Sequence, residues 1–507
     1  MASKSLSKSK YTSFCQCVKQ LWLNAYHPDL ATVDEMTQAR LEAGTQVGIL
    51  AKGFLGPYEE ATVTTGDGRL DYAAMLNRTQ ALIKTGVENI TEAAFSWEGN
   101  YCAVDILHRT ADGYAIYEVK SSTASVDDEG SPTELEPYVQ DIAYQRYVLT
   151  QCGIRVSGTF LMRLNKDYVR GKELDIQQLF CVTDMRQLVE EHLPLVAANI
   201  AEAKRILAKD QEPDILLGRH CKNPYECAFM DYCMRNVPHP SVFDLYRIRF
   251  ASAAENYYQG IDTFAKTRNI KLTDIQQMQV ECTLKGKDYV DKAAVRDFLS
   301  TLHFPLYFLD FETQQMVVPE YEGSRPYQQI PFQYSLHYIE HEGGELKHKE
   351  FLGISGKDPR HALAEQLVAD IPMGACTTAY NKAFECTRLK ELAVDFPDLA
   401  EYLLDIKEHI IDFLMPFQKG FYYRPAMGGS FSIKSVLPAL FPDDPSLDYH
   451  NLEGDVHNGS EAMNIYPKIQ YMTPADQART RKALLEYCKL DTYAMVKVFW
   501  KLLEVSE

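Results

Sequence analysis

Alternating and periodic apolar residues indicate which elements this chain forms. The stretch YCAVDILHRTADGYAIYEVKSS alternates apolar and polar positions, which predicts strands near residues 101–108 and 114–120 joined by a turn at Asp112-Gly113. The segment PLYFLDFET, just after Phe304, predicts a strongly apolar strand, and QMQVECTL predicts one short extended piece. DIAYQRYVL and, near the C-terminus, LLEYCKLDTYAMVKVFWKLL have helical periodicity.

Changes in these patterns divide the 507 residues into three regions. At roughly 100–200 residues per domain, the chain is too long for a single hydrophobic core. Residues 1–240 mix helices with the β-hairpin and end in a cysteine-rich stretch. Residues 241–302 are expected to form a helical connector, and residues 303–507 have α/β character. The predicted fold class is therefore α/β and multidomain.

Composition and charge narrow the class of protein. Hydrophobic residues make up 46% and charged residues 24% of the chain, and no window approaches the roughly 18 apolar residues of a membrane span. The 52 basic and 70 acidic residues give a net charge of −18, which argues against an evenly basic surface and leaves a local groove for any nucleic-acid contact. The start, MASKSLSKSKYTSF, lacks the apolar core of a secretory signal. We therefore expect a globular cytoplasmic protein without a membrane partner.

The predicted hairpin carries the first candidate site. Period-2 alternation places Glu118 and Lys120 on one face of the second strand, and Asp105 on the partner strand is expected to reach that face. Two carboxylates can hold Mg²⁺ or Mn²⁺, while a lysine can orient the attacking water and balance charge on a phosphodiester transition state. The alternative is an exposed hairpin with ordinary alternating charges.

The order of these residues resembles a known family. D-x12-E-V-K in a hairpin, followed by a helix with Gln145 and Tyr147, resembles the PD-(D/E)XK nuclease core of the RecB-like family. The resemblance implies a restriction-endonuclease-like core with Asp105 and Glu118 as metal ligands. The implied active site comprises Asp105, Glu118, Lys120, Gln145 and the upstream Glu92. Gly48 stands where the family often has a metal-binding histidine.

Four of the twelve cysteines form the second candidate site. HCKNPYECAFMDYC places Cys221, Cys227 and Cys233 at equal spacing, and SKYTSFCQCVKQLWL offers Cys15 and Cys17. Three plus one supply the four thiolates of an iron-sulfur cluster, whereas a zinc site and unrelated buried cysteines are the alternatives. CVKQLWL resembles the C-P-x-x-F/Y segment of RecB-like nucleases of the CRISPR-associated and AddB type. That resemblance implies that Cys17 is the fourth ligand of a 4Fe-4S cluster.

The third candidate site is spread over the C-terminal region. Asp310 and Glu312 share one face of the apolar strand, and Tyr487 and Asp491 share one face of the C-terminal helix. Between them, in TTAYNKAFECTRL, a strand is expected to end near Asn381 and a helix to carry Glu385. Such carboxylates can hold two metal ions while the tyrosine positions the attacking water. Strand-end caps and solvated helix faces are the alternative for each piece.

The order D-x-E, N-x-x-F-[D/E], Y-x-x-x-D resembles the DnaQ-like exonucleases of the DEDDy type. The resemblance covers about residues 303–505 and implies an RNase H-like fold and 3'-5' exonuclease activity. The implied metal ligands are Asp310, Glu312, Glu385 and Asp491. The family usually has aspartate at the position of Glu385, and Asp412 is a second candidate for the third carboxylate. The fusion of both regions resembles an uncharacterised bacterial family.

Together these sites predict a metal-dependent nuclease with a 4Fe-4S cluster and Mg²⁺ or Mn²⁺ as cofactors. Its partner is nucleic acid, with DNA favoured over RNA by family analogy alone. DNA repair, recombination or defence against foreign DNA would each fit. Two alternatives stay open: a nucleic-acid-binding scaffold in which one or both nuclease sites have decayed, and an RNA exonuclease.

Overall fold

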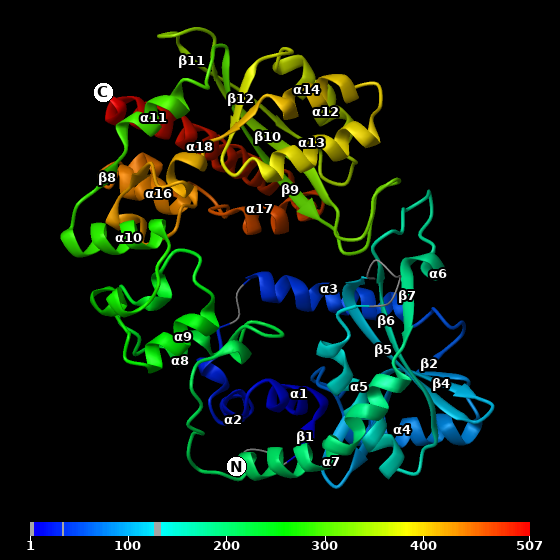
Figure 1. Ribbon diagram of the computed structural model, residues 1–507. Helices are drawn as coiled ribbons and strands as arrows, with labels where there is room; N and C mark the ends of the chain where they lie inside the picture. The colour runs from blue at the N-terminus through cyan, green and yellow to red at the C-terminus, as the bar shows by residue number, and fades with distance from the viewer. Residues whose placement is uncertain (1–4, 33–34, 126–132) are drawn as a thin grey trace. The chain divides into compact units, whose positions relative to one another are not determined.

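The computed structural model describes residues 5–32, 35–125 and 133–507 (Figure 1). The chain forms two compact units, Met1–Asn236 with Val317–Tyr327, and Val237–Met316 with Gln328–Glu507. Each unit combines helices with its own sheets, which confirms the prediction of an α/β, multidomain chain. The predicted connector, residues 241–302, lies inside the second unit, and the segment Val317–Tyr327 belongs to the first.

The first unit is built on one twisted sheet. In the described residues its strands follow the order β2-β3-β4-β5-β6-β7, and β1 pairs with β4. The strands are β1 (Leu6–Ser7), β2 (Glu59–Glu60), β3 (Asn89–Trp97), β4 (Asn100–Thr110), β5 (Gly113–Ala124), β6 (Val156–Asn165) and β7 (Phe180–Asp184). The helices are α1 (Lys8–Gln16), α2 (Val18–Tyr26), α3 (Glu35–Ala51), α4 (Tyr72–Thr85), α5 (Glu136–Gln151), α6 (Ile176–Leu179), α7 (Arg186–Leu207) and α8 (Met230–Met234).

The predicted hairpin is confirmed as β4 and β5. The two strands pair antiparallel from Ile106 opposite Tyr117 to Thr110 opposite Gly113. A Cβ atom at Gly113 would lie 2.2 Å from the main-chain oxygen of Arg155, so the turn requires glycine there. Helices α1, α2, α5 and α7 pack on one face of this sheet, and α3 packs on the other. The hairpin is therefore an interior part of the unit, covered on both faces.

The second unit has a five-stranded sheet in the order β11-β10-β9-β12-β13. Strand β9 is antiparallel to β10 and parallel to β12. Its strands are β9 (Leu306–Gln315), β10 (Gln329–Ile339), β11 (Leu346–Leu352), β12 (Cys376–Ala379) and β13 (Ile410–Asp412), with a separate pair β8 (Tyr289–Val290) and β14 (Tyr422–Tyr423). The helices are α9 (Phe250–Tyr258), α10 (Asp274–Lys285), α11 (Lys292–Leu299), α12 (Arg360–Asp370), α13 (Ala383–Asp395), α14 (Ala400–Glu408), α15 (Met415–Gln418), α16 (Ile433–Leu440), α17 (Gly459–Ile465) and α18 (Pro474–Ser506).

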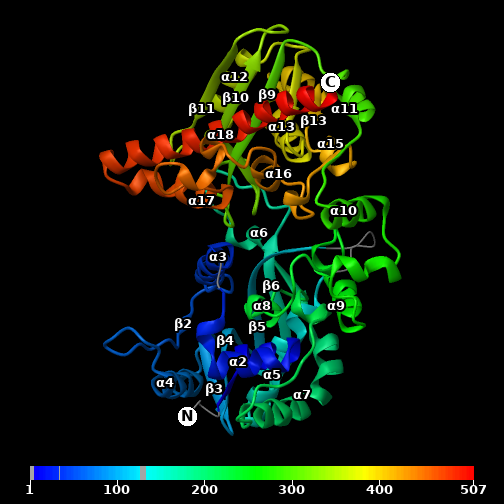
Figure 2. The ribbon, with the colours of Figure 1, turned by 90° about the vertical axis from the view of Figure 1, so that its left-hand side faces the viewer.

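Strand β9 is buried on both faces, and its alternation decides where its carboxylates point. Tyr307, Leu309 and Phe311 pack with apolar residues of α12, α13 and α14. Leu306 and Phe308 pack instead with residues of the long helix α18, which crosses the other face of the sheet (Figure 2). Because successive side chains alternate, Asp310 and Glu312 continue the face that α18 covers.

One predicted element is wrong. QMQVECTL does not form an extended piece but lies in helix α10. The Thr273 side chain accepts a hydrogen bond from the Gln276 N–H, and the Gln276 side chain accepts one from the Thr273 N–H. Gly286, at φ 60°, ends the helix in the left-handed conformation. This capping box and C-terminal glycine define a helix more strongly than the β-branched residue at its centre disfavours one.

Candidate active sites

A cavity of about 450 Å³ in the second unit is lined by every residue that the sequence placed in its C-terminal site. These residues are Asp310, Glu312, Glu385, Tyr487 and Asp491. They come from three elements far apart in sequence: strand β9, the first turn of α13 and the middle of α18. Glu312, Glu385, Tyr487 and Asp491 are buried.

The local fold explains how Glu385 reaches this cavity. Strand β12 runs parallel to β9 and ends at Ala379, and Asn381 turns the chain at φ 68° into α13. Asp412, the alternative third carboxylate, does not line the cavity. Its Oδ1 accepts hydrogen bonds from the N–H groups of Asn381 and Leu414, each at 2.9 Å. Asp412 therefore fixes the turn that precedes Glu385.

Burial and mutual repulsion disfavour the ionised carboxylates in this cavity. Burial and the charges of Asp491 and Glu312 raise the pKa of Asp310 well above its usual value. Burial and the charge of Asp491 likewise raise the pKa of Glu312 well above its usual value. Burial raises the pKa of Glu385 to about 8 and the pKa of Asp491 to about 6. The buried Oε2 of Glu385 has no hydrogen-bond partner among the described residues.

This donor set fits divalent metal ions. The described chain contains one group of three ligand atoms within 4.8 Å of one another, from Asp310, Glu312 and Cys488. Oxygen ligands are what Mg²⁺ and Mn²⁺ prefer, and a bound cation removes the repulsion that raises these pKa values. The unpartnered Glu385 oxygen is the clearest sign of a metal site, because a buried carboxylate oxygen needs a partner.

Three residues in or beside this cavity were not found from the sequence. The Tyr449 hydroxyl donates a hydrogen bond of 2.6 Å to Asp491 Oδ1, and the Cys488 thiol lies 3.6 Å from Asp310 Oδ2. Lys434, the second residue of α16, lines the cavity. Only Cys488 had a sequence signal, since it follows Tyr487 in the last motif. Tyr449 lies in a short 3-10 turn without a periodic pattern, so nothing local pointed to it.

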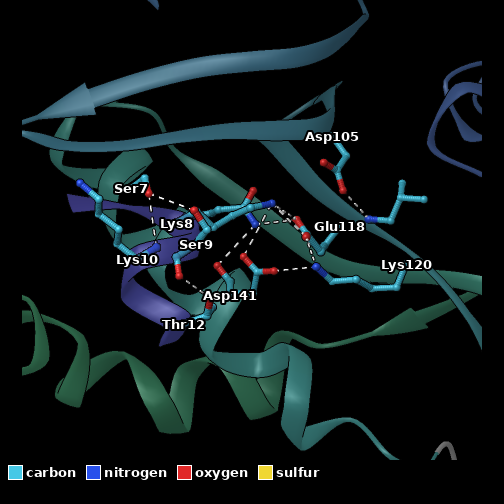
Figure 3. A network of polar contacts seen from close by, with 11 residues as sticks. Ser7, Lys8, Ser9, Lys10, Thr12, Asp105, Glu118, Lys120 and Asp141 are labelled. Atoms are coloured by element: carbon cyan, nitrogen blue, oxygen red, sulfur yellow. Dashed lines mark hydrogen bonds and ion pairs between the residues drawn. The ribbon is translucent and has the colours of Figure 1, made fainter. Parts of the chain in front are cut away.

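In the first unit, four charged side chains form a closed network (Figure 3). Lys120 Nζ lies 2.7 Å from Glu118 Oε1 and 2.7 Å from Asp141 Oδ2. Lys8 Nζ lies 3.0 and 3.1 Å from the two Glu118 oxygens and 3.7 Å from Asp141 Oδ1. The Gln145 side chain donates to Glu118 Oε2 at 2.6 Å. The structure thus brings Glu118, Lys120 and Gln145 together and adds Lys8 and Asp141.

Lys8 and Asp141 reach this network for different reasons. Lys8 begins α1 directly after β1, which pairs parallel with β4 at Leu6 opposite Asn100. Asp141 stands one helical turn before Gln145 on α5, so both side chains project from one face of that helix. Although burial opposes it, the charges of Lys120 and Lys8 lower the pKa of Glu118. Glu118 is therefore held ionised by protein groups alone.

Asp105 lies beside this network but makes different contacts. Its Oδ2 accepts the Val119 N–H at 2.7 Å, and it lines a separate cavity of about 380 Å³ together with Glu92 and Gly48. Burial and the charge of Glu118 raise the pKa of Asp105 to about 7. In the register of β3 and β4, Glu92 stands opposite Asp105 with φ 53°, a strained backbone for a non-glycine residue in a strand.

The first-unit carboxylates do not form an open metal shell in this arrangement. Both oxygens of Glu118 receive N–H groups, and no three ligand atoms of these residues lie within 4.8 Å in the described chain. At Gly48 a Cβ atom would meet nothing within 4 Å. The cavity therefore has room for a side chain at this position, but the imidazole that the family often places there is missing. In the described residues Glu118 is thus occupied by protein donors, whereas Asp105 lines the neighbouring cavity.

The four predicted cysteines line one small cavity in the first unit. Cys17 joins α1 to α2, Cys221 ends a 3-10 turn, and Cys233 lies in α8, with Cys227 between the last two. Cys15 does not line this cavity. Burial raises the pKa of Cys227 to about 11, and the charges of Cys17 and Cys233 contribute to that rise. None of the twelve cysteines forms a disulfide.

The spacing of these thiols bears on the ligand they fit. A single zinc ion at Zn–S distances of about 2.3 Å would hold its sulfurs about 3.8 Å apart. In the described chain the four cysteines do not appear as a group with ligand atoms within 4.8 Å. The sulfur atoms are therefore spaced more widely in this structure than a single bound zinc ion would hold them.

Residues 307–432 match a protein family described as a domain of unknown function, DUF2779. The chain is also 28% identical over 228 residues to Uncharacterized protein UU173 of Ureaplasma parvum serovar 3. That match covers 41% of this chain and 32% of the relative, so the chain spans about a third of the relative's length. Among the described helices, none has the length and apolar character to cross a membrane.

Proposed function

We propose that this protein is a metal-dependent nuclease whose main chemistry lies in the second unit. The proposed activity is that of a DEDDy-type 3'-5' exonuclease with an RNase H-like fold, acting on DNA in preference to RNA. The observation that carries the proposal is the cavity lined by Asp310, Glu312, Glu385, Tyr487 and Asp491, in which a buried carboxylate oxygen has no partner. DNA repair, recombination or defence would use such an activity in the cytoplasm.

The residues of this cavity would have different roles in the reaction. Asp310, Glu312, Glu385 and Asp491 would hold the metal ions, which when bound would supply an activated water and stabilise charge on the phosphate. Tyr487 would position the attacking water by its hydroxyl. Tyr449 holds Asp491 in place, and this hydrogen bond lowers the pKa of Asp491 against the effect of burial.

The decisive experiment uses the purified full chain with Mg²⁺ or Mn²⁺. Single- and double-stranded DNA and RNA, labelled at the 5' end, should be shortened stepwise from the 3' end, with DNA preferred. Asp310→Asn should lower the rate by at least about 100-fold, because it removes a ligand charge without removing volume. Asp398→Asn is the matched control, since that aspartate is exposed and lies outside the cavity. Equal digestion by wild type and Asp310→Asn would refute the proposal.

The third carboxylate has its own test. Glu385→Asp restores the residue usual in the DEDDy family, so activity should be kept or should rise if Glu385 is a ligand. Glu385→Gln should lose activity. If Asp412→Asn loses activity while Glu385→Gln keeps it, the third ligand is assigned wrongly.

The first unit is proposed as a second nuclease centre with a 4Fe-4S cluster. The assembly of Glu118, Lys120 and Gln145 supports the centre, and the shared cavity of Cys17, Cys221, Cys227 and Cys233 supports the cluster. Gly48 and the Lys8 ammonium on Glu118 support the rival proposal of a nucleic-acid-binding platform with a decayed site. A variant whose second unit is inactive distinguishes the nuclease centre from the binding platform.

That variant is Asp310→Asn, in which the second unit is inactive. Any remaining metal-dependent cleavage that Lys120→Ala abolishes belongs to the first unit, because the lysine would stabilise the transition state. Since Lys120 also pairs with Glu118 and Asp141, circular dichroism must show that the variant is folded. Complete inactivity of Asp310→Asn with retained DNA binding would establish the platform instead.

A further inference from the structure

Lys434 is the one cationic side chain among the described residues that line the carboxylate cavity. The other charged groups there are Asp310, Glu312, Glu385 and Asp491. A lysine so placed is expected to form an ion pair with one of them. Within the part of the chain that the structure describes, however, its ammonium makes no hydrogen bond or ion pair.

Two tyrosine rings hold this ammonium instead. Lys434 Nζ lies 5.5 Å from the ring centre of Tyr449 and 5.6 Å from the ring centre of Tyr487. The negative faces of the two rings attract the cation and favour this position. The same two rings direct their hydroxyl groups toward Asp491. Lys434 is therefore kept near the carboxylates, and its charge lowers the pKa of Glu312 and Asp491, but it forms no ion pair with them in the described residues.

The charge balance of the cavity indicates what this ammonium is for. Four carboxylates match the charge of two divalent ions, so with metal bound the acidic groups no longer demand a lysine. Lys434 is exposed and lines the cavity, so it is accessible to a bound ligand. The remaining anion in a nuclease site is the phosphate of the substrate, and lysine binds phosphate as a mobile point charge.

We propose that Lys434 binds a backbone phosphate of the nucleic-acid strand in this cavity, as a substrate-binding residue. The inference rests on the proposed exonuclease function and adds the group that engages the charged backbone. The tyrosines then have two roles: their hydroxyls engage Asp491, and their rings orient the phosphate-binding lysine. This contact is independent of base identity, so it contributes affinity without sequence preference.

Salt dependence tests this contact directly. Binding of a 5'-fluorescein single strand to the full chain is measured by anisotropy with Ca²⁺ in place of Mg²⁺, from about 50 to about 200 mM salt. Each phosphate neutralised on a single strand contributes about 0.7 to the slope of log K against log salt. Lys434→Met should reduce the magnitude of that slope by about 0.7, and Lys434→Arg should retain it. Lys390→Met, an exposed lysine on α13 outside the cavity, is the matched control and should leave it unchanged.

Two results would overturn the inference. The first is an unchanged slope in Lys434→Met. If this variant also binds Ca²⁺ differently, Lys434 is only a counter-ion of the carboxylates. The second is an equal loss in Lys390→Met. Should Lys434→Met not fold, Lys434→Gln gives the same comparison at this exposed position. An unchanged slope leaves the exonuclease proposal standing, whereas that proposal fails if the wild type digests nothing or if Asp310→Asn digests normally.

Discussion

Metal binding to the second unit should release protons. Glu385 alone should release almost one proton per chain. With a pKa of about 8, the Glu385 carboxyl is about 90% protonated near pH 7, whereas a metal ion binds the carboxylate. Asp491, with a pKa of about 6, would add about 0.1 proton. Asp310 and Glu312 add to this release, because their pKa values are also raised. The expected total near pH 7 is at least about one proton.

Isothermal titration calorimetry with Mn²⁺ in two buffers of different ionisation enthalpy measures this number. Glu385→Gln should release about 0.9 proton less than wild type near pH 7, and the difference should fall to about 0.1 near pH 9. Glu401→Gln, an exposed carboxylate on α14, is the control and should match wild type. Equal proton release by wild type and Glu385→Gln would refute both the buried, protonated state of Glu385 and its role as a ligand.

The same pKa shifts set the pH dependence of stability without metal. A carboxyl whose pKa is higher in the folded chain than in the unfolded chain binds more protons when folded. The contribution of Glu385 to the free energy of unfolding is then greatest below its unfolded pKa of about 4.3. This contribution falls as the pH rises toward about 8. Thermal unfolding of the metal-free chain should show this decline, and Mn²⁺ should reverse it. A transition temperature that rises over this range would contradict the assignment.

Three further changes test the remaining groups. Tyr449→Phe removes a hydrogen bond of 2.6 Å and should slow single-turnover cleavage about tenfold, corresponding to about 1.4 kcal/mol; no change would make this tyrosine structural only. Cys227→Ser, purified without oxygen, should lose iron, sulfide and brown colour and unfold at a lower temperature, whereas Cys15→Ser should keep them; a colourless wild type holding one zinc would exclude the cluster. Lys8→Met should destabilise the first unit by about 1–3 kcal/mol in urea relative to Lys10→Met, because a buried carboxylate loses one of its donors.

The sequence determined those features that depend on local periodicity. Alternation along 306–312 assigned Asp310 and Glu312 to one face, and helical spacing assigned Tyr487 and Asp491 to another, because both follow from backbone geometry alone. The order of motifs then named the residues that line one cavity in the folded chain. The preference for Cys17 over Cys15 came from the resemblance of CVKQLWL to the C-P-x-x-F/Y segment of RecB-like nucleases, and Cys17 lines the cysteine cavity whereas Cys15 does not.

Only the tertiary structure decided the partners that lie far apart along the chain. The ammonium of Lys8 reaches Glu118 across 110 residues because β1 pairs with β4, and no periodicity encodes that pairing. Tyr449 and Lys434 meet α18 through an irregular segment and a short helix, whose path depends on packing against the rest of the unit. Local sequence fixes the direction in which a side chain leaves its own element. The group that it meets is set by the summed packing of the whole unit, which a local pattern does not contain.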